Sequence, residues 1–260
     1  MDERRRLSFG TVADLYDQSR PSYPEELVDG VLEFAGADEP DRAVEVGAGT
    51  GKATLLFAER GLNVVAIEPS AEMAGVARRN CADYDNVTIV QTEFERWRPP
   101  GPEFRLVFSG QAWHWISPEV RYVAARAALE EGGALAAFWN RPDWSACDLR
   151  DEIAEAYRVG GRGGDTDDPM NPTGRFEDNF WSEEIAGADG FDGAEVRRYQ
   201  WHSDYTAAEY VALLGTHSPC LILDPPERER LLADIAAAID GHGGSFRMPY
   251  VTVLGLARAS

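Results

Sequence analysis

The chain has 260 residues, of which 44% are hydrophobic and 10% aromatic, enough to bury the core of one large α/β domain. Its formal net charge of −20 disfavours DNA, RNA and anionic membranes as partners, because polyanions are repelled by such a surface. No apolar run approaches the roughly 18 residues of a membrane span, and no apolar stretch follows the charged N-terminus as in a signal peptide, so we expect a cytoplasmic protein.

The first 30 residues or so have a mixed, partly helical pattern that contains the punctuated stretch Ser19–Pro24, followed by a helix predicted at Glu25–Phe34. The next hundred residues alternate between strands and helices. The predicted strands are Ala43–Val46, Val64–Ile67, Val87–Gln91, Leu106–Ser109 and Ala134–Trp139. The predicted helices are Ala53–Arg60, Ala71–Asn80 and Pro118–Leu129. This alternation indicates a doubly wound α/β fold, with a parallel sheet covered on both faces.

After Asn140 the alternation ends. We expect a helix at Asp151–Val159, a mobile loop at Gly160–Gly174, a strand at Glu195–Ser203, helices at Ala207–Leu214 and Pro226–Asp240, and a last strand at Tyr250–Ala257. The sequence therefore predicts a single domain with an α-helical cap. Its core would comprise residues 30–140, 191–203 and 245–260, and its cap and lid residues 1–29, 141–190 and 204–244.

The strongest motif is the loop Gly47–Gly51, Gly-Ala-Gly-Thr-Gly, which follows a strand and opens a helix. Glycines there let a ligand approach the main chain at the carboxyl end of the strands. The third glycine comes one residue too early for the G-x-x-G spacing of a dinucleotide site, and the phosphate-loop pattern is absent. Glu68 ends the second strand, 21 residues after Gly47, where a carboxylate can accept hydrogen bonds from ribose hydroxyls.

This loop, together with the acidic end of the second strand, resembles class I S-adenosylmethionine-dependent methyltransferases. Further stretches resemble a subgroup of trans-aconitate methyltransferase-like (methyltransferase type 11) enzymes: Tyr16–Pro24, Ser109–Trp115, Leu213–Ser218 and Arg247–Tyr250. The resemblance covers nearly the whole chain. It implies a seven-stranded sheet with the last strand antiparallel, and S-adenosyl-L-methionine as the cofactor.

The resemblance also implies which residues surround the cofactor. Glu45, Gly47, Ala48, Gly49 and Gly51 would line its methionine and ribose end, and Glu68 would hold the ribose. Pro69 and Met73 would lie near the adenine. Glu93 stands where such proteins often have Asp after the third strand, followed by Phe94. We add three residues to the predicted cofactor site: Tyr16, Arg20 and Gln111.

Methyl transfer requires placing a nucleophile close to the sulfonium methyl group and excluding water. His114 is the only titratable side chain in the segment Gln111–Trp115, so it could act as a general base or orient the acceptor. Trp113 and Trp115 are candidates for aromatic faces against the cation. Arg20 and Arg141 are candidates for binding an acceptor carboxylate, and His217 lies in a segment that the resemblance places near the acceptor.

The sequence thus predicts methyl transfer to a small-molecule acceptor, through O-methylation of an acidic metabolite. The alternatives are a non-catalytic adenosyl-ligand-binding protein and a methyltransferase acting on a phenolic or amine natural product or on a protein. A nicotinamide oxidoreductase is disfavoured by the early third glycine. No cysteine or histidine spacing matches a metal site, so no metal is predicted. The oligomeric state stays open.

Overall fold

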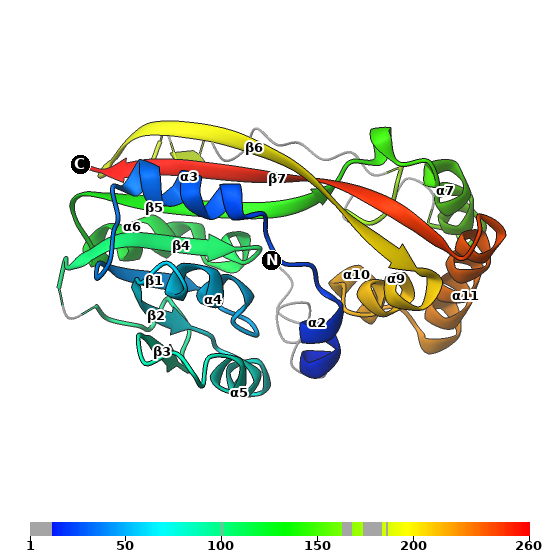
Figure 1. Ribbon diagram of the computed structural model, residues 1–260, viewed down its shortest axis with the longest axis horizontal. Coiled ribbons are helices and arrows are strands. Elements are labelled where there is room, and N and C mark those ends of the chain that lie inside the picture. Colours follow the sequence, from blue (N-terminus) through cyan, green and yellow to red (C-terminus); the bar gives the residue numbers. More distant parts are fainter. Residues whose placement is uncertain (1–11, 100, 163–167, 174–183, 186) are drawn as a thin grey trace.

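The protein is described by a computed structural model that covers residues 12–99, 101–162, 168–173, 184–185 and 187–260. A seven-stranded sheet has the strand order β3-β2-β1-β4-β5-β7-β6 (Figure 1). Its strands are β1 (Arg42–Val46), β2 (Asn63–Ile67), β3 (Val87–Val90), β4 (Phe104–Gly110), β5 (Leu129–Pro142), β6 (Phe191–Thr206) and β7 (Ser245–Ala259). β1 to β5 pair in parallel, and β7 is antiparallel to both β5 and β6. The predicted fold class, including the antiparallel last strand, is confirmed.

Helices cover both faces of the sheet, and others lie beyond its end. The helices of the described residues are α2 (Ala13–Ser19), α3 (Glu25–Ala35), α4 (Lys52–Ala58), α5 (Ala71–Asn80), α6 (Pro118–Ala128), α7 (Arg150–Val159), α9 (Ala207–Leu214), α10 (Ser218–Leu221) and α11 (Pro225–Gly241), with short 3-10 turns η2 (Trp113–Trp115) and η3 (Trp144–Ala146). One core cluster contains Leu27 of α3 and Phe57 of α4, and a second contains Tyr122 and Ala125 of α6. Among the described helices, none is both long and apolar enough to cross a membrane.

The strands at one side of the sheet are longer than the sequence predicts. β7 begins at Ser245, five residues before the predicted start at Tyr250, and it continues through Pro249. Pro249 is paired with His202 of β6, and its carbonyl accepts a hydrogen bond from the Asp143 amide on the other side. The N–H and C=O of one strand residue point to the same side, so the missing N–H of Pro249 would also point toward β5. Because β5 has already ended at Pro142, no hydrogen bond between the strands is lost.

The helices α7, α9 and α11 form a third hydrophobic cluster beyond the end of the core sheet (Figure 1). The long strands β5, β6 and β7 run from the core toward this cluster, which we call the cap. α9 begins with a capping box, in which Thr206 accepts from the Glu209 amide and the Glu209 carboxylate accepts from the Thr206 amide. Parts of the loop predicted at 160–174, namely residues 163–167 and 174, lie outside the described residues.

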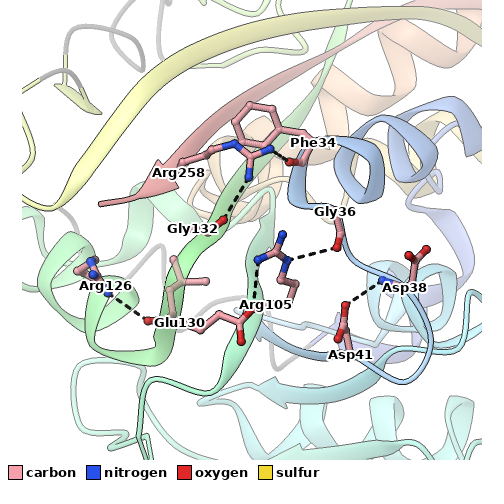
Figure 2. A network of polar contacts seen from close by, with 10 residues as sticks. Phe34, Gly36, Asp38, Asp41, Arg105, Arg126, Glu130, Gly132 and Arg258 are labelled. Atoms are coloured by element: carbon pink, nitrogen blue, oxygen red, sulfur yellow. Dashed lines mark hydrogen bonds and ion pairs between the residues drawn. The ribbon is translucent and has the colours of Figure 1, made fainter.

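At the amino-terminal ends of the parallel strands, arginines bind backbone carbonyls (Figure 2). Arg105 donates to the Gly36 carbonyl at the end of α3 (3.3 Å) and to the Glu130 carboxylate (3.1 Å). Arg258 donates to the carbonyls of Gly132 (3.1 Å) and Phe34. These contacts satisfy carbonyls at a helix end and a strand turn, so this end of the sheet has a structural role.

A chain of polar side chains crosses the opposite end of the sheet. The Trp201 indole donates to the Thr252 hydroxyl (2.8 Å), which donates to the side-chain oxygen of Asn140 (2.7 Å). The Asn140 amide nitrogen donates to the Ser22 carbonyl (3.0 Å), in the linker between α2 and α3. Thr252 is fully buried and Asn140 is 7% exposed, so neither group can exchange its partner for bulk water.

Replacing Thr252 by Val should destabilise the fold by about 2–3 kcal/mol, because the Trp201 donor and the Asn140 acceptor both lose their partner. Urea unfolding followed by circular dichroism should show a lower midpoint with an unchanged slope. Thr88→Val, on the exposed side of edge strand β3, is the matched control and should change stability by less than about 0.5 kcal/mol. Equal stability of the two variants would contradict the role given to this chain.

Candidate active site

The strand order reverses between β1 and β4, and the carboxyl ends of these two strands form the centre of the candidate site. The Ser109 hydroxyl donates to the Val46 carbonyl (2.7 Å) and so joins the two strand ends. The amides of Gly47 and Ala48 both donate to the Ile67 carbonyl at the end of β2 (2.9 and 3.0 Å). The start of the glycine loop is therefore fixed to three neighbouring strands.

Two glycines shape this loop for different reasons. A Cβ atom on Gly47 would lie 2.3 Å from the Ala112 Cβ, so glycine allows the segment after β4 to approach β1. At Gly49 the φ angle is +59°, and a Cβ would meet only the Met73 methyl group, at 3.9 Å. The loop thus keeps an open main-chain surface at Gly49, beside the start of α5.

Glu68 ties the glycine loop to the end of β2. Its Oε2 accepts from the Gly49 amide (2.9 Å) and its Oε1 from the Ser70 amide (2.9 Å). Ser70 in turn caps α5 by accepting from the Met73 amide. Each carboxylate oxygen has a further lone pair, so Glu68 can hold the loop and still accept hydrogen bonds from a ligand.

Glu45 is a second carboxylate at this edge, one strand away from Glu68. It is 1% exposed, and the Thr54 hydroxyl of α4 donates to it. Burial raises the pKa of the Glu45 carboxyl to about 8; the Thr54 hydrogen bond opposes this shift and the negative charge of Glu68 adds to it. At neutral pH the buried carboxyl is therefore mostly protonated.

The segment from α2 to α3 connects the cofactor loop with the cap. On the loop side, Asn80 donates to the Asp17 carboxylate (3.0 Å) and to the Thr50 carbonyl (2.9 Å). On the cap side, Arg20 donates to the hydroxyl and carbonyl of Thr216, at 2.8 and 2.9 Å. α2 contacts both α5 and α9, and we call residues 12–24 the strap.

Basic side chains gather where the strap meets the cap and β5. Burial lowers the pKa of His217 well below its ordinary value, and the nearby charges of Arg20 and Arg141 lower it further. Burial likewise lowers the pKa of His114 to about 4, with Arg141 and Arg121 acting in the same direction. Arg141 thus lies close to both histidines, and both rings are neutral at physiological pH.

The comparisons with known proteins agree with this geometry. A family model described as a methyltransferase domain matches residues 43–133. An uncharacterized methyltransferase of Mycobacterium tuberculosis is 29% identical over 256 residues, which cover 95% of this chain and 93% of the relative. The chain is a class I S-adenosylmethionine-dependent methyltransferase. Its cofactor is S-adenosyl-L-methionine, and the glycine loop and Glu68 lie where the resemblance in sequence places the cofactor.

Solved structures share the methyltransferase fold at low sequence identity. A protein of Anaeromyxobacter dehalogenans assigned as a type II methyltransferase superposes with a TM-score of 0.68 at 21% identity, covering 92% of this chain and 97% of the other. Phosphoethanolamine N-methyltransferase 2 of Haemonchus contortus, in complex with phosphomonomethylethanolamine and S-adenosylhomocysteine, gives a TM-score of 0.57 at 15% identity. That match covers 98% of this chain and 59% of the nematode protein, and it bears on the fold alone.

The residues of the methyltransferase fit an adenosyl cofactor. Glu68 offers carboxylate lone pairs for ribose hydroxyls, and the space over Gly49 lets a ligand reach the main chain. Met73 is buried with Ala13 and Val76, and Tyr16 of the strap packs against this group. Gly51 has a different role, because a Cβ there would meet Ala77 of α5 and Cys81 just after it, so this glycine allows close packing of the loop against α5. Pro69 is exposed, and Glu93 pairs with Arg96 (2.9 Å).

Two predicted site side chains belong to the core. Trp113 has no exposed surface and packs against Phe94 and Tyr122, so the prediction of an aromatic face at Trp113 is corrected. Phe94 is also fully buried, in the same cluster, and its ring does not frame a ligand. Both rings fill the space between the sheet and α6. Trp115 and His114, by contrast, are only partly buried in η2, and Gln111 donates weakly to the Asn140 carbonyl (3.4 Å).

Sequence reasoning missed Tyr23, in the linker that follows the strap helix. Its ring packs edge-on against Phe138 of β5 (4.8 Å between centroids), and a Cβ on Gly110 would lie 2.7 Å from its hydroxyl oxygen. Gly110 therefore makes room for this hydroxyl at the end of β4. The flanking Pro21 and Pro24 were the only local signal, and they indicate a turn rather than a site residue.

Replacing Glu45 by Gln should stabilise the ligand-free methyltransferase at alkaline pH. An ordinary glutamate titrates near 4.5, whereas folded Glu45 has a pKa of about 8. Stability is therefore fully present below pH 4.5 and is lost as the pH rises through 8, while Gln cannot ionise. The difference in unfolding free energy between Glu45→Gln and the wild type should therefore rise by about 3 kcal/mol, in favour of the variant, from pH 5 to pH 8. A difference that does not change with pH would show that Glu45 titrates normally.

Proposed function

We propose that the protein transfers a methyl group from S-adenosylmethionine to a carboxylate oxygen of a small acidic metabolite. The observation that carries the proposal is the group of Arg20, Arg141, His114 and His217 at the carboxyl edge of the sheet, in a chain whose net charge is −20. The local positive charge of the two arginines attracts an anionic ligand, although the rest of this negatively charged molecule repels it. The guanidinium of Arg20 has five donors, of which Thr216 takes two, so donors are left for an acceptor.

Bound S-adenosylmethionine supplies an electrophilic sulfonium methyl group at this edge. The protein's own residues bind and orient: Glu68 and the glycine loop hold the cofactor, and Arg20 and Arg141 hold the acceptor's charge. A carboxylate is ionised at neutral pH, so it needs placement rather than deprotonation. The low pKa of both histidines fits this chemistry, because neutral rings leave the positive charge to the arginines.

The strap serves as a lid over the bound cofactor. It packs on Met73 through Tyr16, and the Arg20 guanidinium lies over the Tyr16 ring, 4.8 Å from its centroid. A lid at this place excludes water from the transfer. The lid predicted from the sequence began at residue 8, and residues 8–11 lie outside the described residues.

Hydrogen exchange should test the lid. Amides of residues 12–24 should exchange more slowly when S-adenosylhomocysteine is bound, because the ligand adds contacts to this segment and lowers the population of its open form. Amides of β7 near Leu254 serve as the internal control, since this strand is buried with or without ligand. Unchanged exchange in the strap at saturating ligand would argue that this segment plays no part in closing the site.

A panel assay should identify the acceptor class. Release of S-adenosylhomocysteine is measured with dicarboxylates and tricarboxylates such as succinate, citrate and trans-aconitate, and with phenols and amines as competitors. We expect turnover with carboxylates. Arg141→Ala should raise the acceptor KM about 10- to 100-fold, the size of a charge-assisted hydrogen bond, and leave S-adenosylhomocysteine affinity unchanged.

The matched control is Arg230→Ala, which removes the same charge from the exposed surface of α11 and should leave KM unchanged. Turnover of phenols or amines alone would rule out the acidic acceptor and leave the methyltransferase assignment intact. Binding of S-adenosylmethionine without turnover of any panel member would favour the non-catalytic alternative.

A further inference from the structure

His114 has one ring nitrogen already in use. The indole nitrogen of Trp139 donates a hydrogen bond to His114 Nδ1 over 3.0 Å. An indole N–H has no lone pair to offer and can only donate, so Nδ1 must be the unprotonated nitrogen of the ring. A neutral imidazole carries one proton, and that proton is therefore on Nε2.

The surroundings hold the ring in this state. Trp139 is 3% exposed, within β5 and in the same core cluster as Trp113, so its indole cannot swing away without opening the core. The charged groups that act on the His114 ring are Arg141 on β5 and Arg121 on α6, and both are positive. Neither can accept the Nε2 proton, and both oppose a second proton on the ring.

We propose that Trp139 positions His114 as a hydrogen-bond donor to the acceptor, and that His114 is not the general base of the reaction. This inference rests on the proposed function and narrows it, because a donor at His114, in place of a base, suits an acceptor that is already ionised. The acceptor oxygen uses a lone pair to form the new O–CH₃ bond, and the electron pair of the broken C–S bond stays on sulfur. No proton is released in this step, so the Nε2–H group can hold the carboxylate throughout.

A base at His114 would require the opposite tautomer. Its Nε2 lone pair becomes available only if the proton moves to Nδ1, where it would face the Trp139 N–H directly. That arrangement replaces a hydrogen bond by two opposed donors in a buried place, which costs the penalty of two unsatisfied polar groups. The aromatic ring of Trp115, 4.8 Å from the His114 ring centroid, provides no alternative acceptor for that proton.

Nitrogen NMR of the full chain tests the tautomer without any acceptor. The chain has four histidines, so ¹⁵N-labelled histidine gives few signals, and His114→Gln assigns those of His114. We expect a protonated Nε2 and an unprotonated Nδ1 in the wild type at pH 7, and a mixture of both tautomers in Trp139→Phe. Trp115→Phe, which removes the other adjacent indole, should keep the wild-type tautomer. A protonated Nδ1 in the wild type would overturn the proposal.

Kinetics with the carboxylate found in the panel tests the role. Gln keeps an amide donor close to the Nε2 position and cannot act as a base, so His114→Gln should retain kcat/KM within about tenfold. His114→Ala removes the donor and should lose about 10- to 100-fold, mainly in the acceptor KM. The kcat of the wild type should be flat between pH 6 and pH 8. If Gln is as inactive as Ala, at about 10²- to 10⁴-fold, His114 is the base and the proposal is wrong.

The NMR and the kinetic experiments can fail independently, so together they distinguish the tautomer proposal from the proposed function. Failure of all carboxylates in the panel, together with the expected tautomer, would refute the acidic acceptor and leave the Trp139–His114 arrangement intact. Turnover of a carboxylate together with a protonated Nδ1 would refute the arrangement alone. In each variant, unchanged S-adenosylhomocysteine affinity shows that the fold and the cofactor site are preserved.

Discussion

The hydrogen bonds of the Asn140 side chain hold together three parts of the chain at the carboxyl edge of the sheet. Its oxygen accepts from Thr252 of β7 and its nitrogen donates to the linker at Ser22, while the residue itself belongs to β5. Because an amide offers both a donor and an acceptor, one residue can bridge two elements that carry opposite groups. Arg141 is the next residue of β5, and Arg20 and Tyr23 lie on either side of Ser22. The Asn140 amide therefore helps to set their relative positions, together with the contacts of Arg20 with Thr216 and of Tyr23 with Phe138.

The site has two electrostatic halves on opposite sides of the strand-order reversal. Glu68, after β2, holds the glycine loop and carries the negative charge on the cofactor side, whereas the buried Glu45 on β1 is mostly protonated at neutral pH. Arg141 after Asn140, and Arg20 through its contacts with Thr216, lie on the side of β5 and the cap. Such a division favours a cation on one side and an anion on the other, and it brings them together at Gly47 and Ala112, where the two halves touch. With the anionic acceptor proposed above, the attraction between the two ligands would help to orient the acceptor.

The sequence predicted the sheet well because its signals are local. The glycine loop, the acid after β2 and the alternation of strands with helices are each readable within a few residues, and the fold follows from their order. Hydrogen-bond partners that are distant in the chain could not be predicted from the sequence. Trp139 lies 25 residues from His114, and Thr216 lies 196 residues from Arg20. Trp113 was misjudged for a related reason. A three-residue turn such as η2 has no periodicity that separates its fully buried Trp113 from its partly buried His114 and Trp115.

The continuity of β7 has a consequence for how the molecule unfolds. At about 3.4 Å per residue, its 15 residues extend about 50 Å. Along that length it contributes Phe246 and Met248 to the cap cluster, Leu254 and Leu256 to one face of the sheet, and Ala257 and Ala259 to the other. A strand shared by three hydrophobic clusters transmits the loss of packing in one of them to the other two. Cap and sheet are therefore coupled through β7, and among the described residues the cap is joined to the sheet by this continuous backbone.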